Sequence, residues 1–365
     1  MPYTELSEAQ VEQFVATGIV TVKSAIPKAV AQQWVADAFG RLGYDPNRPS
    51  TWVEPFGRAP KTDEEEVRVL APRAWAAIED LLGGPGRVDQ QAWRGGAGAG
   101  AVWPNDLAGN FGSAAERAAG AESWVAPGDA DAQGVPLGGW HIDGGHFRHF
   151  LDSPEQGLLT VVAWTDIRER SGGTFVALDS IGPVAKLLAS QPEGLHPDGV
   201  MGSGYLIPGL LRECQQLTEL TADQGDVILM HPLVLHRVSG NPSGVARFIA
   251  NPTVRLTTPL DLNRPCVDDY SPVERAILRG LGREHFVFVP ARPRREVPFG
   301  GGLPSVRSPA QRVQELAELE VSMSTGLTQL LWNFFLLNCF RHGTIDWLHP
   351  LFLCRRRRRD CRGRA

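Results

Sequence analysis

The feature that most constrains the fold of this chain is a set of four polar residues that are far apart in the sequence. His141 and Asp143 are separated by one residue, whereas His236 and Arg247 follow much later. Residues two apart in a β-strand point to the same side, so His141 and Asp143 can face one point together. His236 and Arg247 also lie in short apolar runs that are typical of strands. A fold that unites all four must therefore bring a late strand beside an early one.

Two imidazoles and one carboxylate form a ligand set with which proteins bind Fe(II) on one face, leaving the other face open. We therefore predict that His141, Asp143 and His236 are metal ligands and form the catalytic centre. Arg247 precedes the apolar residues 248–250, and a buried arginine needs an anionic partner. Its guanidinium could bind the carboxylate of an acidic co-substrate.

Other histidines compete for these roles. His146 and His149 could replace His141, but neither begins a His-x-Asp pair. His231 competes with His236 as the distal ligand, although it precedes a proline that would interrupt strand pairing. The alternative for His146, His149 and His231 is to line a pocket or to form hydrogen bonds in the core.

Short apolar runs separated by turn residues predict a β-rich core. The 40 Gly and 28 Pro of the chain favour many turns over a helical bundle. Strands are predicted at 19–22, 158–164, 173–178, 227–230, 233–238 and 247–254. Helices are predicted at 7–16, 27–42, 72–82 and 271–281, and loops at 94–135. This pattern indicates a mainly β fold of the sandwich or jelly-roll kind with flanking helices.

The C-terminal residues differ from the rest of the chain. We predict one domain over residues 1–310 and an atypical tail over residues 311–365. The tail holds an apolar segment, Leu327–Phe340, which is too short to span a bilayer, and a run of five arginines, Arg355–Arg359. A poorly ordered tail is the prediction, and a contact of the tail with an anionic membrane is the alternative.

Composition limits the partners and the compartment. A net charge of -5 gives no reason to expect a nucleic acid as partner. The N-terminus lacks the basic and apolar regions of a secretory signal. The five scattered cysteines form neither a zinc motif nor a disulfide framework. We therefore predict a cytoplasmic protein that acts on a small-molecule substrate.

Residues from about 5 to 300 resemble the phytanoyl-CoA dioxygenase-like family of Fe(II)/2-oxoglutarate-dependent oxygenases. The resemblance rests on Leu6–Phe14 with Gly18, His141-Ile142-Asp143, Val161–Trp164, Ser171–Phe175, Gly225-Asp226-Val227, His236, Asn241 and Arg247. It implies a double-stranded β-helix (a cupin-like jelly roll) in which His141, Asp143 and His236 ligate iron. It also implies that Arg247 pairs with the distal carboxylate of 2-oxoglutarate and that Trp164 lines the co-substrate pocket.

The resemblance further implies a dioxygenase with Fe(II) as cofactor, 2-oxoglutarate and O₂ as co-substrates, and ascorbate as a supporting reductant. Because Asp143 leaves no carboxylate position vacant for a halide, hydroxylation with release of succinate and CO₂ is expected over halogenation. The chain departs from the family at Val238, where a small hydroxyl residue is common, and at Ala177–Ser180, which replaces a Pro-Gly-Ser-His element. Two alternatives are a catalytically silent jelly-roll binding protein and a cupin-type enzyme whose metal acts as a Lewis acid without O₂.

Overall fold

The computed structural model describes residues 3–90, 101–124, 140–145, 147–195 and 210–294, which belong to a unit that extends over Met1–Ser305. The predicted tail at 311–365 lies outside the described residues, as do 94–100 and 125–135 of the predicted loops. Within the described ranges, no helix combines the length and the apolar character that crossing a membrane requires.

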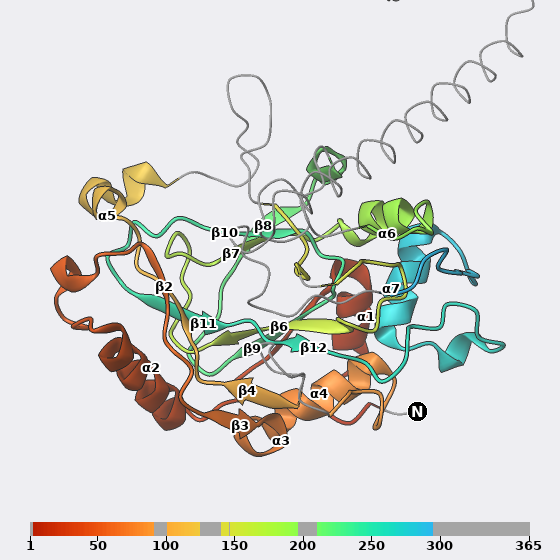
Figure 1. The fold of residues 1–365 in the computed structure, drawn as a ribbon, viewed down its shortest axis with the longest axis horizontal. Coiled ribbons are helices and arrows are strands. Elements are labelled where there is room, and N and C mark those ends of the chain that lie inside the picture. The colour runs from red at the N-terminus through yellow and green to blue at the C-terminus, as the bar shows by residue number, and fades with distance from the viewer. Residues whose placement is uncertain (1–2, 91–100, 125–139, 146, 196–209, 295–365) are drawn as a thin grey trace, which may run out of the picture. The chain divides into compact units, whose positions relative to one another are not determined.

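The described part is a mixture of helices and antiparallel sheets (Figure 1). The helices are α1 (Glu8–Thr17), α2 (Lys28–Leu42), α3 (Val67–Leu70), α4 (Pro72–Leu82), α5 (Ala114–Ala119), α6 (Ile181–Ala189) and α7 (Pro272–Leu281). The strands are β1 (Ile19–Val22), β2 (Phe56–Arg58), β3 (Glu64–Glu66), β4 (Val102–Pro104), β5 (Ala108–Asn110), β6 (Leu158–Ala163), β7 (Thr174–Ala177), β8 (Leu217–Leu220), β9 (Val227–Met230), β10 (His236–Val238), β11 (Arg247–Ala250) and β12 (Thr253–Val254). Helices therefore contribute more than the sequence predicted, and the loop prediction for 94–135 missed β4, β5 and α5.

Two antiparallel sheets carry the predicted site. The larger sheet has the order β1-β9-β6-β11-β5-β2, with β12 also paired to β6, and the smaller has the order β10-β7-β8. A further pair, β3 with β4, is separate. From β6 onward the chain alternates between the sheets: β6 is in the larger, β7 and β8 in the smaller, β9 in the larger, β10 in the smaller and β11 in the larger. This alternation places the strands of His236 and Arg247 in different sheets.

The predicted strand at 247–254 is present but interrupted. Both β11 and β12 pair with β6, in one continuous register. The interruption falls at Asn251 and Pro252, since proline has no N–H to donate to the ladder. Side chains alternate along a strand, so Arg247, Ile249 and Asn251 face the same side of the larger sheet.

The opposite side of β11 packs against α2 through aromatic rings. Phe248 lies 5.0 Å from Phe39 of α2 between ring centroids, and 5.5 Å from Phe111. At the end of β6, Trp164 stacks on Trp34 of α2 with 4.5 Å between centroids. These contacts close one face of the sheet with buried apolar area, which leaves the face of Arg247 and Asn251 for the site.

Local signals set the helix ends. Ser7 and Ser271 both accept from the backbone of the third helical residue in complete capping boxes, as predicted. Helix α1 ends at Gly18, whose φ of 75° favours glycine. A Cβ there would approach Val234 Cγ2 to 2.4 Å, so only glycine lets the helix end this close to the segment that leads to β10.

Candidate metal centre

An isolated β-bridge brings His141 and His236 side by side. His141 N donates to His236 O at 2.9 Å, and His236 N donates to His141 O at 2.9 Å. The segment of the His-x-Asp pair thus extends the smaller sheet beyond β10. The structure has a single bridge at His141 where the sequence predicted a strand, and Asp143 lies in the bend that follows.

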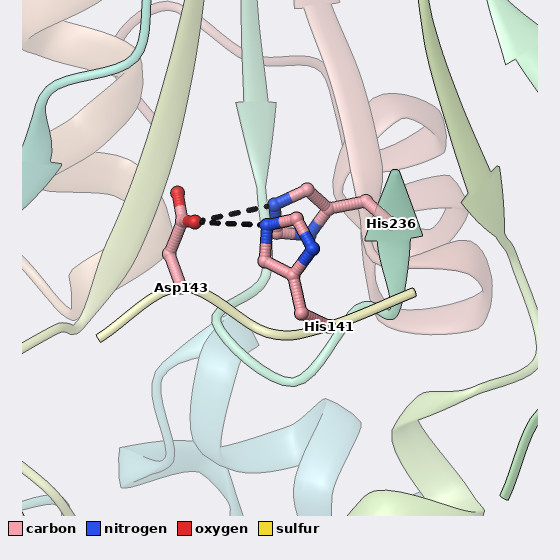
Figure 2. A group of neighbouring side chains, drawn as sticks. All are labelled: His141, Asp143 and His236. Atoms are coloured by element: carbon pink, nitrogen blue, oxygen red, sulfur yellow. Dashed lines mark ion pairs between the residues drawn. The ribbon is translucent and has the colours of Figure 1, made fainter. Parts of the chain in front are cut away.

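The side chains of these residues converge (Figure 2). Asp143 Oδ1 lies 3.3 Å from His141 Nε2 and 3.5 Å from His236 Nε2. The three potential ligand atoms all lie within 4.8 Å of one another. Two ligands about 2.1 Å from a metal are about 3.0–3.4 Å apart when adjacent and about 4.2 Å apart when opposite. Asp143 is therefore placed as a neighbour of both imidazoles, as a facial ligand set requires.

Hydrogen bonding prepares His236 as a ligand. Its Nδ1 lies 3.0 Å from Val234 O, and a carbonyl can only accept. Nδ1 therefore carries a proton, and Nε2 is the ring nitrogen on the side of Asp143 that a metal would bind. Burial acts to raise the pKa of Asp143, but the charges and hydrogen bonds of His236 and His141 outweigh it and hold that pKa well below its usual range. An ionised carboxylate between two imidazoles is a donor set for a divalent cation.

The competing histidines have other partners. His231 is fully buried; its Nδ1 accepts from Leu233 N at 3.1 Å, and its Nε2 lies 3.2 Å from Val273 O in α7. Both of its ring nitrogens are thus used in the core. His149 Nε2 lies 3.0 Å from Gly144 O, and His146 lies outside the described residues. The structure brings His236, and not His231, to His141 and Asp143.

The environment of His231 predicts a loss of stability in acid. Burial lowers the pKa of His231 to about 3, far below the value of about 6.5 in an unfolded chain. As pH falls, His231 therefore takes up a proton in the unfolded chain at a higher pH than in the folded protein. The free energy of unfolding is highest above pH 6.5 with respect to this residue, and it decreases as pH falls from 6.5 toward 3. We expect the free energy of unfolding to fall by about 2 kcal/mol between pH 7 and pH 5 through this residue. Urea unfolding should show a flatter pH dependence for His231→Gln than for the wild type; parallel curves would contradict this assignment.

Arg247 lies on β11 with its side chain buried, 4% of the residue being exposed. Its Nε donates to Gly172 O and its Nη1 to Ala108 O at 3.5 Å, so its hydrogen bonds to described residues go to main-chain carbonyls. Burial lowers the pKa of Arg247 to about 10, and the charge of Glu219 opposes this effect. A buried guanidinium that lacks an ion pair is costly, so a bound carboxylate would stabilise it.

The strand geometry relates Arg247 to the three converging side chains. Asn251, on the same side of β11 and β12, has its Nδ2 3.4 Å from Asp143 Oδ2. Arg247 is four residues earlier, about 13 Å along the strand. A small dicarboxylate that reaches from a metal at Asp143 toward the long Arg247 side chain would lie along this face.

Trp164 has a packing role. Its ring is fully buried and stacks on Trp34, on the side of the sheet that α2 covers. Ala163, the preceding residue in β6, pairs with Ile249, so its side chain lies on the same face of the sheet as Arg247, opposite to α2. The predicted contact of Trp164 with the co-substrate stays a prediction, and stacking on α2 accounts for its burial without a ligand.

Sequence reasoning missed two residues beside the converging side chains. Asn251 approaches Asp143, and Arg58 Nη2 donates to Asn251 Oδ1 at 3.1 Å. Strand alternation from Arg247 could have selected Asn251. No sequence signal selects Arg58, which comes from the short strand β2.

Comparison with protein-family models gives no match, and comparison with curated proteins gives none either. Solved structures are similar to the chain at low identity. HygX from Streptomyces hygroscopicus, with nickel, 2-oxoglutarate and hygromycin B bound, is 13% identical, and the alignment covers 69% of this chain and 88% of HygX with a TM-score of 0.37. The epimerase SnoN, in complex with Fe³⁺, α-ketoglutarate and nogalamycin RO, is 17% identical over 80% of this chain and 94% of its own, with a TM-score of 0.40. The nickel complex of the non-heme monooxygenase ThoJ is 17% identical over 69% of this chain and 81% of its own, with a TM-score of 0.33.

Proposed function

We propose that this chain is an Fe(II)- and 2-oxoglutarate-dependent dioxygenase that hydroxylates a small organic substrate. The proposal is supported above all by the convergence of the three side chains: Asp143 Oδ1 lies beside His141 Nε2 and His236 Nε2, and the three potential ligand atoms lie within 4.8 Å of one another. Two imidazoles and one carboxylate on one face of a metal are typical of non-heme Fe(II) oxygenases. On the basis of the sequence motifs, we also propose that the chain is related to the phytanoyl-CoA dioxygenase-like family.

The proposed fold of residues 1–310 is a double-stranded β-helix with flanking helices. It is supported by the alternation of β6 to β11 between two antiparallel sheets. Such a winding would bring residues from distant strands to one interior site. Helix α2 packs on the face of the larger sheet that carries Trp164 and Phe248, so this face is the outer one. The opposite face, which carries Arg247, would then line the interior of the fold.

Each site residue has a proposed role. His141, Asp143 and His236 would hold Fe(II), with Asp143 supplying the negative charge and the two histidines neutral donors. Arg247 would orient the far carboxylate of 2-oxoglutarate through a charge-assisted bidentate contact. When bound, iron with 2-oxoglutarate and O₂ supplies the oxidising power, leaving succinate and CO₂. Ascorbate is expected to support turnover by keeping iron reduced.

Succinate formation tests this proposal. Protein supplied with Fe(II), ascorbate, 2-oxoglutarate and a panel of small organic substrates should form succinate only when iron and O₂ are both present. Asp143→Ala should form none, because the metal loses its charged ligand. A silent binding protein would form no succinate in any condition, and a Lewis-acid enzyme would convert its substrate without O₂; either result would overturn the proposal.

A further inference from the structure

We infer that Asn251, oriented by Arg58, is a positioning residue that makes Asp143 bind the metal through one oxygen only. The inference rests on the proposed metal site and deepens it. It begins from an asymmetry between the two carboxylate oxygens of Asp143. Both imidazoles face Oδ1, at 3.3 and 3.5 Å, whereas the Asn251 amide nitrogen lies 3.4 Å from Oδ2.

Arg58 determines which end of the Asn251 amide faces Asp143. A guanidinium carries donors only, so the group that Arg58 Nη2 approaches at 3.1 Å must be the amide oxygen of Asn251. The NH₂ group is then turned toward Asp143. A flipped amide would set NH₂ against the guanidinium and an oxygen against the carboxylate, and both contacts would be repulsive.

Arg58 is itself held in place. Its Nη1 donates to Asp106 O at 3.0 Å and to Asp106 Oδ2 at 3.2 Å. This ion pair balances the charge of Arg58, so the guanidinium does not compete with a metal for Asp143. The backbone of Asn251 is held in place because the strands before and after it, β11 and β12, both pair with β6 in one register. The sequence of contacts Asp106–Arg58–Asn251–Asp143 thus connects β2 to the site.

The consequence concerns the open positions of the metal. A carboxylate that binds through both oxygens would occupy two positions, whereas one that binds through Oδ1 alone leaves half of an octahedral sphere free. A co-substrate that chelates through two atoms, together with O₂, needs all three of those positions. Asn251 would preserve them by retaining Oδ2 in a hydrogen bond.

Metal affinity, measured without turnover, tests the role of Asn251. Titration of Co(II), followed by its absorption, should show about 10-fold weaker binding for Asn251→Leu, the size of effect that partners of metal ligands usually have. Binding of 2-oxoglutarate to the Co(II)-loaded variant should also weaken, because the freed Oδ2 competes for a position. The thermal unfolding of the metal-free protein should change little.

Arg58→Gln gives a second variant at a half-exposed side chain, where misfolding is not expected. It should weaken Co(II) binding in the same direction and to a smaller extent, since the Asn251 amide is then free to flip. Arg292→Gln is the matched control: Arg292 is 53% exposed against 47% for Arg58, and its ion pair is with Glu193. This control should bind Co(II) as the wild type does.

The outcomes separate the inference from the proposed function. The inference is supported by weaker Co(II) binding in Asn251→Leu and Arg58→Gln, together with weaker 2-oxoglutarate binding to Co(II)-loaded Asn251→Leu and wild-type Co(II) binding in Arg292→Gln. Tight binding by the wild type with unchanged affinity in Asn251→Leu and Arg58→Gln overturns it and leaves the proposed metal site intact. Absence of Co(II) binding by the wild type overturns the proposed site and the inference with it.

Discussion

His236→Ala is expected to weaken Co(II) binding by about 100-fold or more, beyond the range for residues that only support a ligand. The reason is that three donor atoms converge on one point, and His236 Nε2 is one of them. Its removal leaves His141 and Asp143, which together cannot complete a facial set. Formation of succinate should fall to the background rate in the same variant. Co(II) titration by absorption, before any turnover assay, measures the first effect directly.

His285→Ala is the matched control for this prediction. His285 is exposed and contacts Tyr270 through its Nδ1 at 2.8 Å, away from the three converging side chains. It should retain the Co(II) affinity of the wild type. If His236→Ala bound Co(II) as tightly as this control, His236 would not be a ligand.

Arg247→Ala should raise the KM for 2-oxoglutarate by about 10- to 100-fold, the loss expected when a charged hydrogen-bonded pair is broken. Arg247 is buried and bonds main-chain carbonyls among the described residues, and if its guanidinium binds the carboxylate of 2-oxoglutarate as proposed, the variant loses that contact in the ground and transition states alike. Co(II) affinity should change far less, because Arg247 is about 13 Å along the strand from Asn251. Initial rates of succinate formation over a range of 2-oxoglutarate concentrations provide the measurement.

Arg247→Lys separates charge from geometry. Lysine keeps the positive charge but cannot form the planar, two-pronged contact, so it should restore only part of the affinity. Thermal unfolding of both variants shows whether the fold is intact, since Arg247 also donates to main-chain carbonyls. Equal KM values in wild type, Arg247→Lys and Arg247→Ala would mean that 2-oxoglutarate is bound elsewhere.

Elements with strong local signals were predicted closely. The capping box at Ser7, the glycine at Gly18 and the apolar spacing of α4 are local properties, and the structure confirms these helices. The helix at 181–189 was missed because its N-cap, Ser180, makes no side-chain capping bond. Strand β5 was missed because it is short and contains Gly109, and its stability comes from pairing with β2 and β11. Pairing of this kind depends on residues far away in the sequence.

In the candidate site too, some residues could be predicted from the sequence and others could not. Residue type and spacing were enough to predict that His141, Asp143 and His236 lie together, and the structure shows that their potential donor atoms converge; their role as metal ligands stays a prediction. The support around them was not predictable, because Arg58 and Asn251 are 193 residues apart and belong to no motif. The placement of Trp164 against α2 depends on which side of β6 faces the helix, and a wholly apolar strand carries no alternation that would indicate this.

We expect one metal and one acidic co-substrate to share the site, and anaerobic calorimetry can measure whether they do. Fe(II) would be titrated first and 2-oxoglutarate second, with the order reversed in a parallel experiment. A shared site predicts that each ligand raises the affinity for the other by the same factor, about 10-fold or more. Asp143→Ala should abolish this coupling, because the metal is no longer held beside the co-substrate. Equal 2-oxoglutarate affinity with and without Fe(II) in the wild-type protein would mean that the metal and the co-substrate do not share a site.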